Sequence, residues 1–126
     1  MGLYLAVAVG GAAGSIGRFG IDRAIERRSF AVFPWATFTI NMTGCLLIGL
    51  IFAALVDRHN TPAWLRTGLV VGFLGGYTTF STFAQEGLDL MREGQSTVAL
   101  LYAVGSVLVG LVAVYAGMAV GRTMLR

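Results

Sequence analysis

The sequence has 126 residues, of which 56% are hydrophobic and only 12% are charged, and its mean hydropathy is +0.78. Long apolar runs with this composition exclude an ordinary soluble domain and are typical of a polytopic α-helical membrane protein. The net charge of +3 results from nine arginines and six acidic residues, and the chain has no lysine. Because these arginines flank apolar segments, they do not indicate a nucleic-acid partner.

Four apolar segments follow one another and predict four membrane helices in one domain, residues 1–126. The first segment covers residues 3–21, and we interpret it as a retained helix because no basic residue precedes it. The others cover residues 34–56, 63–91 and 96–120, and Gly94 predicts a helix stop before the last one. At ~1.5 Å per residue each segment can cross a ~30 Å hydrocarbon core. The connections are short, so we expect antiparallel neighbours.

The third segment contains an unusual stretch, residues 72–83, in which glycines, hydroxyl side chains and aromatic rings are concentrated within an apolar context. Lipid offers no hydrogen bonds to an irregular backbone, which is tolerated at membrane depth only inside protein or beside a wet cavity. The stretch therefore predicts a helix that is broken near its middle, at a binding or conduction site.

The arginines give no clear orientation signal. With four spans, one side carries Arg58, Arg66, Arg122 and Arg126, and the other carries Arg23, Arg27, Arg28 and Arg92. Orientation normally follows an excess of positive residues on the cytoplasmic side, and Arg18 changes this balance by one only. Either the chain inserts both ways and pairs with its own inverted copy, or placement near the helix ends outweighs the count.

Small residues recur at helical spacing and predict close packing between helices, within or between subunits. They are Gly10, Gly14 and Gly17 in the first segment, Gly68 and Gly72 in the third, and Ala113, Gly117 and Gly121 in the fourth.

Enzymatic chemistry finds no support in the sequence. The only histidine, His59, lies in a polar turn beside Asp57, and the single Cys45 is expected to be a small buried hydrophobic residue. A phosphate-binding loop needs a lysine, which the chain lacks. We therefore predict that the chain is not an enzyme.

Two polar residues at membrane depth are the first candidates for an ion path. Asn41 lies near the middle of the second segment and must face protein or water, either as a donor to an ion or as a hydrogen-bonding link between helices. Arg18 lies deep in the first segment, where a charge is costly unless it is paired or reaches the interface.

The remaining candidates are hydroxyls, rings and one carboxylate. Tyr102 and Ser106 are four residues apart on one helix face, although Tyr102 also fits an interfacial anchor. Phe80 and Phe83 are one turn apart and either present ring edges to an anion or belong to the core. Glu86 either lines a vestibule or caps a neighbour. The middles of the first, second and fourth segments carry no acid, so donors to an anion predominate.

Together these residues resemble the CrcB/Fluc fluoride channels of microbial membranes, over the whole chain. The resemblance rests on Gly14-x-x-x-Arg18, on Asn41 within Thr39-Ile40-Asn41-x-x-Gly44, and on the long string of residues 72–83. It implies an antiparallel, dual-topology homodimer with two fluoride pathways and one central structural Na⁺.

The resemblance also implies roles for single residues. Phe80 and Phe83 would form an aromatic box, and Asn41 would be a pore donor. Further polar pathway residues would be Ser81, Thr82, Thr37, Tyr102 and Ser106. The backbone carbonyls of Gly75 and Thr78 from both subunits would hold the Na⁺. Arg18 would add positive potential or fix the local fold, with Glu86 near the pathway.

The sequence thus predicts a passive, fluoride-selective channel that exports toxic fluoride across a bacterial inner membrane. Its partners would be fluoride, membrane lipid and a second copy of the chain, without nucleic acid. Two alternatives stay open: a non-conducting assembly protein, and a proton-coupled multidrug exporter, which the missing central carboxylate disfavours.

Overall fold

The computed structural model describes residues 1–29, 31–56 and 61–124. Asp57, Arg58, His59 and Arg126, which entered the sequence-based predictions, lie outside the described residues. All regular structure in the described ranges is helical. In this described part of the chain, three continuous helices are long and apolar enough to cross a membrane: Gly2–Glu26, Trp35–Leu55 and Ser96–Met124. The chain is therefore an all-α, multi-pass membrane protein.

The helices follow the predicted apolar segments, with two differences. In chain order they are α1 (Gly2–Glu26), α2 (Trp35–Ile51), η1 (Phe52–Val56), α3 (Ala63–Thr67), η2 (Gly68–Leu74), α4 (Gly75–Tyr77), α5 (Phe80–Arg92) and α6 (Ser96–Met124). First, α1 runs past residue 21 to Glu26 and α6 runs past residue 120 to Met124, because hydropathy marks where apolar side chains stop and not where backbone hydrogen bonding stops. Second, η1 and η2 are wider, π-helical stretches, which apolar periodicity does not reveal.

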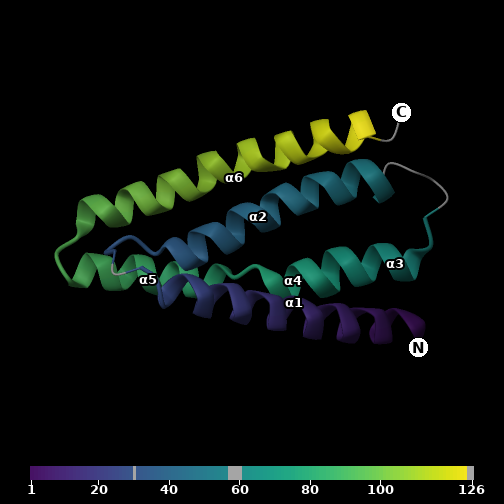
Figure 1. The fold of residues 1–126 in the computed structure, drawn as a ribbon, viewed down its shortest axis with the longest axis horizontal. Helices are drawn as coiled ribbons and strands as arrows, with labels where there is room; N and C mark the ends of the chain where they lie inside the picture. Colours follow the sequence, from purple (N-terminus) through teal and green to yellow (C-terminus); the bar gives the residue numbers. More distant parts are fainter. Residues whose placement is uncertain (30, 57–60, 125–126) are drawn as a thin grey trace.

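The third segment is broken, as the sequence predicts. Helix α4 ends at Tyr77, and Thr78 and Thr79 are extended, with φ/ψ of −84°/158° and −146°/117°. Helix α5 then starts at Phe80, and the side chain of Thr79 caps it by accepting the backbone N–H of Thr82. Figure 1 shows α3, α4 and α5 in one line, so the chain keeps its direction through the break.

The turn between α5 and α6 confirms the helix stop predicted at Gly94. Gly94 has a φ of +76°, which glycine adopts without steric cost. Its N–H donates to Met91 O at 3.2 Å, and the N–H of Gln95 donates to Leu90 O at 2.8 Å. These two bonds form a Schellman motif, which satisfies the last carbonyls of α5.

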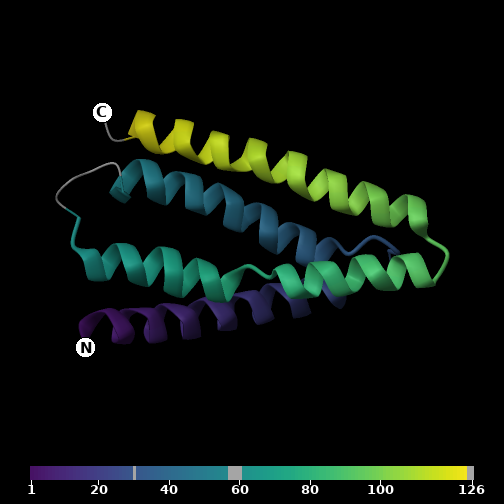
Figure 2. The same cartoon turned by 180° about the vertical axis from the view of Figure 1, so that it is seen from behind.

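The closest helix packing joins alternate segments and not consecutive ones. Helix α1 packs along η2 and α4, and α2 packs along α6. Figures 1 and 2 show that the two members of each pair run in the same direction, whereas consecutive segments run in opposite directions. The expectation of antiparallel neighbours therefore holds along the chain but not for the tightest contacts.

Glycines explain the contact of α1 with the third segment. A Cβ added to Gly10 would overlap Gly68 O, and one added to Gly14 would overlap Phe73 O. Backbone therefore lies directly against backbone, in the geometry that permits Cα–H···O contacts. A Cβ added to Gly17, by contrast, would make only an ordinary contact with the Tyr77 ring, at 3.8 Å.

The pairing of α2 with α6 is reciprocal. A Cβ on Gly49 would overlap Val114 O, and a Cβ on Gly117 would overlap Leu46 O. A Cβ on Gly121 would come within 2.7 Å of the Ala53 side chain. Gly117 and Gly121 of the fourth segment thus pack within the subunit, which settles for these two residues an alternative that the sequence left open.

An aromatic cluster closes the end of the molecule where α5 meets α6. The ring of Tyr102 is 0% exposed and lies 5.3 Å from Phe33 and 4.8 Å from Phe83, centroid to centroid. Phe38 also packs against this cluster. Tyr102 is therefore a core residue, and its interpretation as an interfacial anchor is wrong.

Candidate functional site

Asn41 holds the broken backbone. Its Oδ1 accepts the N–H of Thr79 at 2.9 Å, and its Nδ2 donates to the carbonyl oxygen of Thr79 at 3.1 Å. Thr79 is extended, so these two backbone groups lie outside any helix and need partners from elsewhere. An amide nitrogen carries two hydrogens, so one N–H of Asn41 stays available for another acceptor. Asn41 thus links two helices and can also donate to a ligand.

A second contact from α2 reaches the other side of the break. The hydroxyl of Thr43 lies 2.8 Å from Thr39 O and 3.0 Å from Ile40 O, and 2.7 Å from the hydroxyl of Tyr77. Thr43 has one proton, which its own helix uses, so Tyr77 is the donor in the contact between the two hydroxyls. Neither residue is among the predicted site residues. In the sequence, the features that could have indicated them are a threonine two positions after Asn41 and a tyrosine at the start of the break.

Arg18 binds the end of α4. Its Nε donates to Gly76 O at 3.1 Å, and the hydroxyl of Ser15 lies 3.5 Å from the same oxygen. The break leaves this carbonyl without its normal helical partner, and a helix C-terminus attracts positive charge. The guanidinium is therefore engaged with protein at the break, which favours a role in fixing the local fold.

Two predicted site residues, Thr37 and Tyr102, bind the carboxylate of a third, Glu86. Thr37 donates to Oε1 of Glu86 at 2.7 Å, and Tyr102 donates to Oε2 at 2.7 Å. Thr37 is 2% exposed, so this cluster lies inside the subunit. The hydroxyl protons of Thr37 and Tyr102 both bond to the carboxylate. Neither hydroxyl can therefore donate to an ion while its bond to Glu86 is intact.

The hydroxyls just after the break form a separate group. Thr79 Oγ1 donates to Thr82 Oγ1 at 3.0 Å and lies 3.5 Å from Ser81 Oγ. Ser81 is exposed and Thr82 is half-buried. Thr79 is not among the predicted site residues, although a threonine directly before a helix is a typical N-cap.

A cavity of ≈ 460 Å³ lies along the open side of the break. The predicted site residues that line it are Asn41, Gly75, Thr78, Phe80, Phe83 and Ser106. The Oγ of Ser106 is buried and has no hydrogen-bond partner among the residues that the structure describes. Apart from Thr79, the rest of the cavity wall is apolar, so the few polar groups are the ones that can bind a ligand.

Phe80 and Phe83 differ in their surroundings. Their ring centroids are 5.8 Å apart, with planes tilted by 41°. Phe83 packs against Tyr102, whereas Phe80 is 80% exposed on the open side of the subunit. Phe80 is therefore not a core residue of the single subunit.

Two carbonyl groups at the break can serve a cation. Gly75 is exposed, and it borders the cavity together with Thr78. Within the described ranges, the backbone oxygen of neither residue accepts a hydrogen bond. The same ranges contain no cluster of three His, Cys, Asp or Glu side chains. A hard cation prefers oxygen ligands, so this donor set fits Na⁺.

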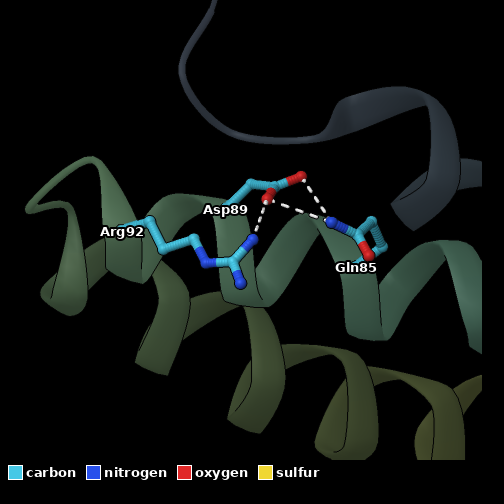
Figure 3. A network of polar contacts seen from close by, with 3 residues as sticks. All are labelled: Gln85, Asp89 and Arg92. Carbon is cyan, nitrogen blue, oxygen red and sulfur yellow. Dashed lines mark hydrogen bonds and ion pairs between the residues drawn. The ribbon is translucent and has the colours of Figure 1, made fainter.

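The outer face of α5 is polar. Gln85 Nε2 lies 3.1 Å from each carboxylate oxygen of Asp89, and Arg92 Nη1 lies 3.7 Å from Asp89 Oδ1 (Figure 3). The side chains of Asp89 and Arg92 are 49% and 67% exposed. Such groups are costly in hydrocarbon, so this face requires water or protein beside it.

Comparison with known proteins confirms the resemblance seen in the sequence. The family model described as CrcB-like protein, Camphor Resistance (CrcB), matches residues 5–118. The chain is 45% identical over 124 residues to a fluoride-specific ion channel FluC of Acidobacterium capsulatum, covering 97% of this chain and 98% of that protein. It is 45% identical over 118 residues to the FluC of Azotobacter vinelandii, covering 94% and 95%. The chain therefore belongs to the CrcB-like family of membrane proteins.

Proposed function

We propose that this protein is a passive, fluoride-selective ion channel. The observation that carries the proposal is its 45% identity, over nearly the full length, to proteins named fluoride-specific ion channels. The cavity at the break adds a physical reason, because it places an amide, a hydroxyl and aromatic rings along one surface. Since its relatives are ion channels, the chain is not an enzyme, as the sequence predicts.

The donors along the cavity suit a small anion. Fluoride must exchange its water for close donors, and it must leave again without being trapped. The second N–H of Asn41 and the hydroxyl of Ser106 can supply such donors, and the ring edges of Phe80 and Phe83 carry partial positive charge. Ser81 and Thr82, which follow the break, would be the next polar residues along the path.

Two copies would be needed to enclose the path. In one subunit Phe80 is largely exposed and the cavity at the break is open, which a membrane protein would not leave to lipid. The balanced arginines support an antiparallel, dual-topology homodimer with two pores. In this arrangement α3 to α5 form the fourth membrane crossing, and the polar face of α5 lies against water or the second copy.

A structural Na⁺ at the centre of the dimer would complete the assembly. The carbonyl oxygens of Gly75 and Thr78 would hold it, with the same two residues from the second copy. The ion would neutralise the negative ends of the broken helices and fix the two subunits together. The bacterial inner membrane is the proposed location, because an export pathway for toxic fluoride must cross it.

Reconstituted protein tests the function directly. Liposomes loaded with potassium fluoride are opened to potassium by an ionophore, and a fluoride electrode follows release, with chloride-loaded liposomes as the control. We expect fast fluoride release and negligible chloride release. Folded protein that releases no fluoride would refute the proposal and favour an assembly protein, and release that requires a proton gradient would favour an exporter.

A further inference from the structure

A short stretch of α2 contacts the break on both sides. Asn41 binds Thr79, the residue after the break, through two hydrogen bonds. Two positions further along α2, Thr43 accepts the hydroxyl of Tyr77, the residue before the break, at 2.7 Å. Helix α2 thus holds both the C-terminal end of α4 and the residue before α5, and so sets the distance between them.

Gly44 brings this stretch of α2 close to the break. Gly44 is buried, and a Cβ at this position would overlap the side-chain methyl group of Thr78. Thr78 in turn donates its hydroxyl back to Leu74 O at 2.8 Å, so its side chain is held on the α4 side. Thr78, in the break, therefore packs directly against the backbone of α2, because Gly44 has no side chain.

Tyr77 is itself held on several sides. It is 5% exposed, and its ring stacks on Phe73 with centroids 5.7 Å apart and planes 7° apart. A Cβ on Gly14 would come within 2.9 Å of its backbone nitrogen, so α1 also lies close to it. A movement of the Tyr77 hydroxyl would therefore move the last turn of α4, which carries the carbonyl of Gly75.

We infer that Tyr77 and Thr43 are positioning residues of the ion pathway, acting through their hydrogen bond. The bond holds the C-terminal end of α4 in register with Asn41 and so places the carbonyls of Gly75 and Thr78. Its effect on ion movement rests on the proposed channel function. Neither side chain touches an ion in this assignment.

Different substitutions of Tyr77 and Thr43 distinguish an effect on positioning from an effect on protein stability. Tyr77→Phe removes the donor and leaves the Thr43 hydroxyl bonded to its own helix. Thr43→Val removes the acceptor and leaves a buried phenol without a partner, which costs more. The double variant Thr43→Val/Tyr77→Phe replaces both partners by apolar groups of similar shape, which can be nearly neutral for stability. It therefore stays foldable while the positioning bond is absent.

The test compares Tyr77→Phe and the double variant with matched controls. Tyr4→Phe removes the hydroxyl of a tyrosine that is 84% exposed, and Thr123→Val removes a hydroxyl that donates to Val120 O of its own helix. Fluoride release from liposomes is measured per folded protein. In detergent, the melting temperature is followed as Na⁺ replaces N-methylglucamine, because an ion that binds the folded state raises it.

We expect both Tyr77→Phe and the double variant to lower the rate of fluoride release roughly fivefold, the effect of one hydrogen bond. The Na⁺ concentration for half-maximal stabilisation should rise by about the same factor, whereas the controls keep wild-type values. Unchanged release and unchanged Na⁺ dependence in the double variant would overturn the inference. Lower thermal stability alone, with release intact, would also overturn it.

Failure of the channel function itself has a different signature. Wild-type protein that releases no fluoride refutes the proposed function before any variant is compared. Wild-type protein that releases fluoride without any response to Na⁺ refutes only the proposed sodium site. In that case the release rate of Tyr77→Phe decides the positioning inference.

Discussion

At the scale of single residues, Asn41 supplies both hydrogen bonds that the extended Thr79 backbone would otherwise lack. A backbone N–H or C=O group without a hydrogen-bond partner in a membrane interior costs on the order of several kcal/mol. This requirement explains an asparagine in the middle of an apolar helix without any reference to an ion. The remaining N–H of the amide is then held in one direction, which suits a donor to a passing anion.

Substitution of Asn41 separates these two tasks. Asn41→Asp keeps an acceptor for the N–H of Thr79 but has no donor, and it places a carboxylate oxygen against Thr79 O. We expect fluoride release to fall at least about tenfold, since a hydrogen bond to a charged group contributes about 1.5–3 kcal/mol. Asn41→Leu removes both bonds, and we expect a lower melting temperature as well.

The control for this prediction is Gln95→Glu, the same amide-to-acid change at an exposed position in the turn after α5. It should leave both release and melting temperature unchanged. Wild-type release from Asn41→Asp would remove Asn41 from the ion pathway and leave it a structural role alone.

At the scale of secondary-structure elements, the subunit consists of two tightly packed parallel pairs. Glycines bring the backbones of α1 and η2 into direct contact, and other glycines do the same for α2 and α6. Between the pairs, side-chain hydrogen bonds gather around the break, from Asn41, Thr43 and Thr37. Polar contacts of the membrane interior therefore gather where the two pairs meet, whereas Arg18 and Ser15 bind Gly76 O within the pair formed by α1 and the third segment.

The glycine contacts of α1 give a direct test of this packing. A Cβ on Gly14 would overlap Phe73 O, a backbone atom that cannot rotate away, whereas a Cβ on Gly20 of the same helix meets nothing within 4 Å. We expect Gly14→Ala to destabilise the protein by about 1–3 kcal/mol, as overpacked sites do. Gly20→Ala should be neutral or slightly stabilising.

Thermal unfolding in detergent, followed by circular dichroism, measures both variants. Equal melting temperatures for Gly14→Ala and Gly20→Ala would mean that α1 does not depend on the close approach to η2 seen here.

At the scale of the whole molecule, the start of α1 and the end of α6 lie at one end, and the ends of α1 and α5 lie at the other (Figures 1 and 2). Arginines occupy the last turns of α1, α3, α5 and α6: Arg23, Arg66, Arg92 and Arg122. Positive charge is thus present at both ends of the subunit. This distribution is what a chain that inserts in both orientations would need.

Shifting the balance should fix the orientation. Arg23→Gln/Arg27→Gln removes two charges from one end, and Arg66→Gln/Arg122→Gln removes two from the other; all four side chains are exposed. We expect each double variant to insert mainly one way and to lose most of its fluoride release, because antiparallel partners become scarce. Labelling of the chain ends from each side of the membrane measures the orientation.

Co-expression of the two double variants provides the control, since oppositely biased chains should pair and restore release. Full release from either variant alone, inserted in one orientation, would contradict an antiparallel dimer.

Apolar segment length and local turn chemistry, both present in the sequence, determined much of the fold. A run of about 20 apolar residues has few alternatives to a membrane helix, so the segments were predicted closely. Gly94 and the polar string at residues 72–83 likewise marked the helix stop and the broken helix. Family membership followed from the same string together with Arg18 and Asn41.

Only the tertiary structure decided which helices pair and where the polar side chains point. The parallel pairs depend on which glycine faces which carbonyl, and this matching joins residues far apart in the chain, such as Gly49 and Val114. The same holds for the sharing of Glu86 between Thr37 and Tyr102, and for the contact of Thr43 with Tyr77. A sequence pattern reports on neighbours within a helix, whereas these contacts arise only when separate helices are brought to a common depth.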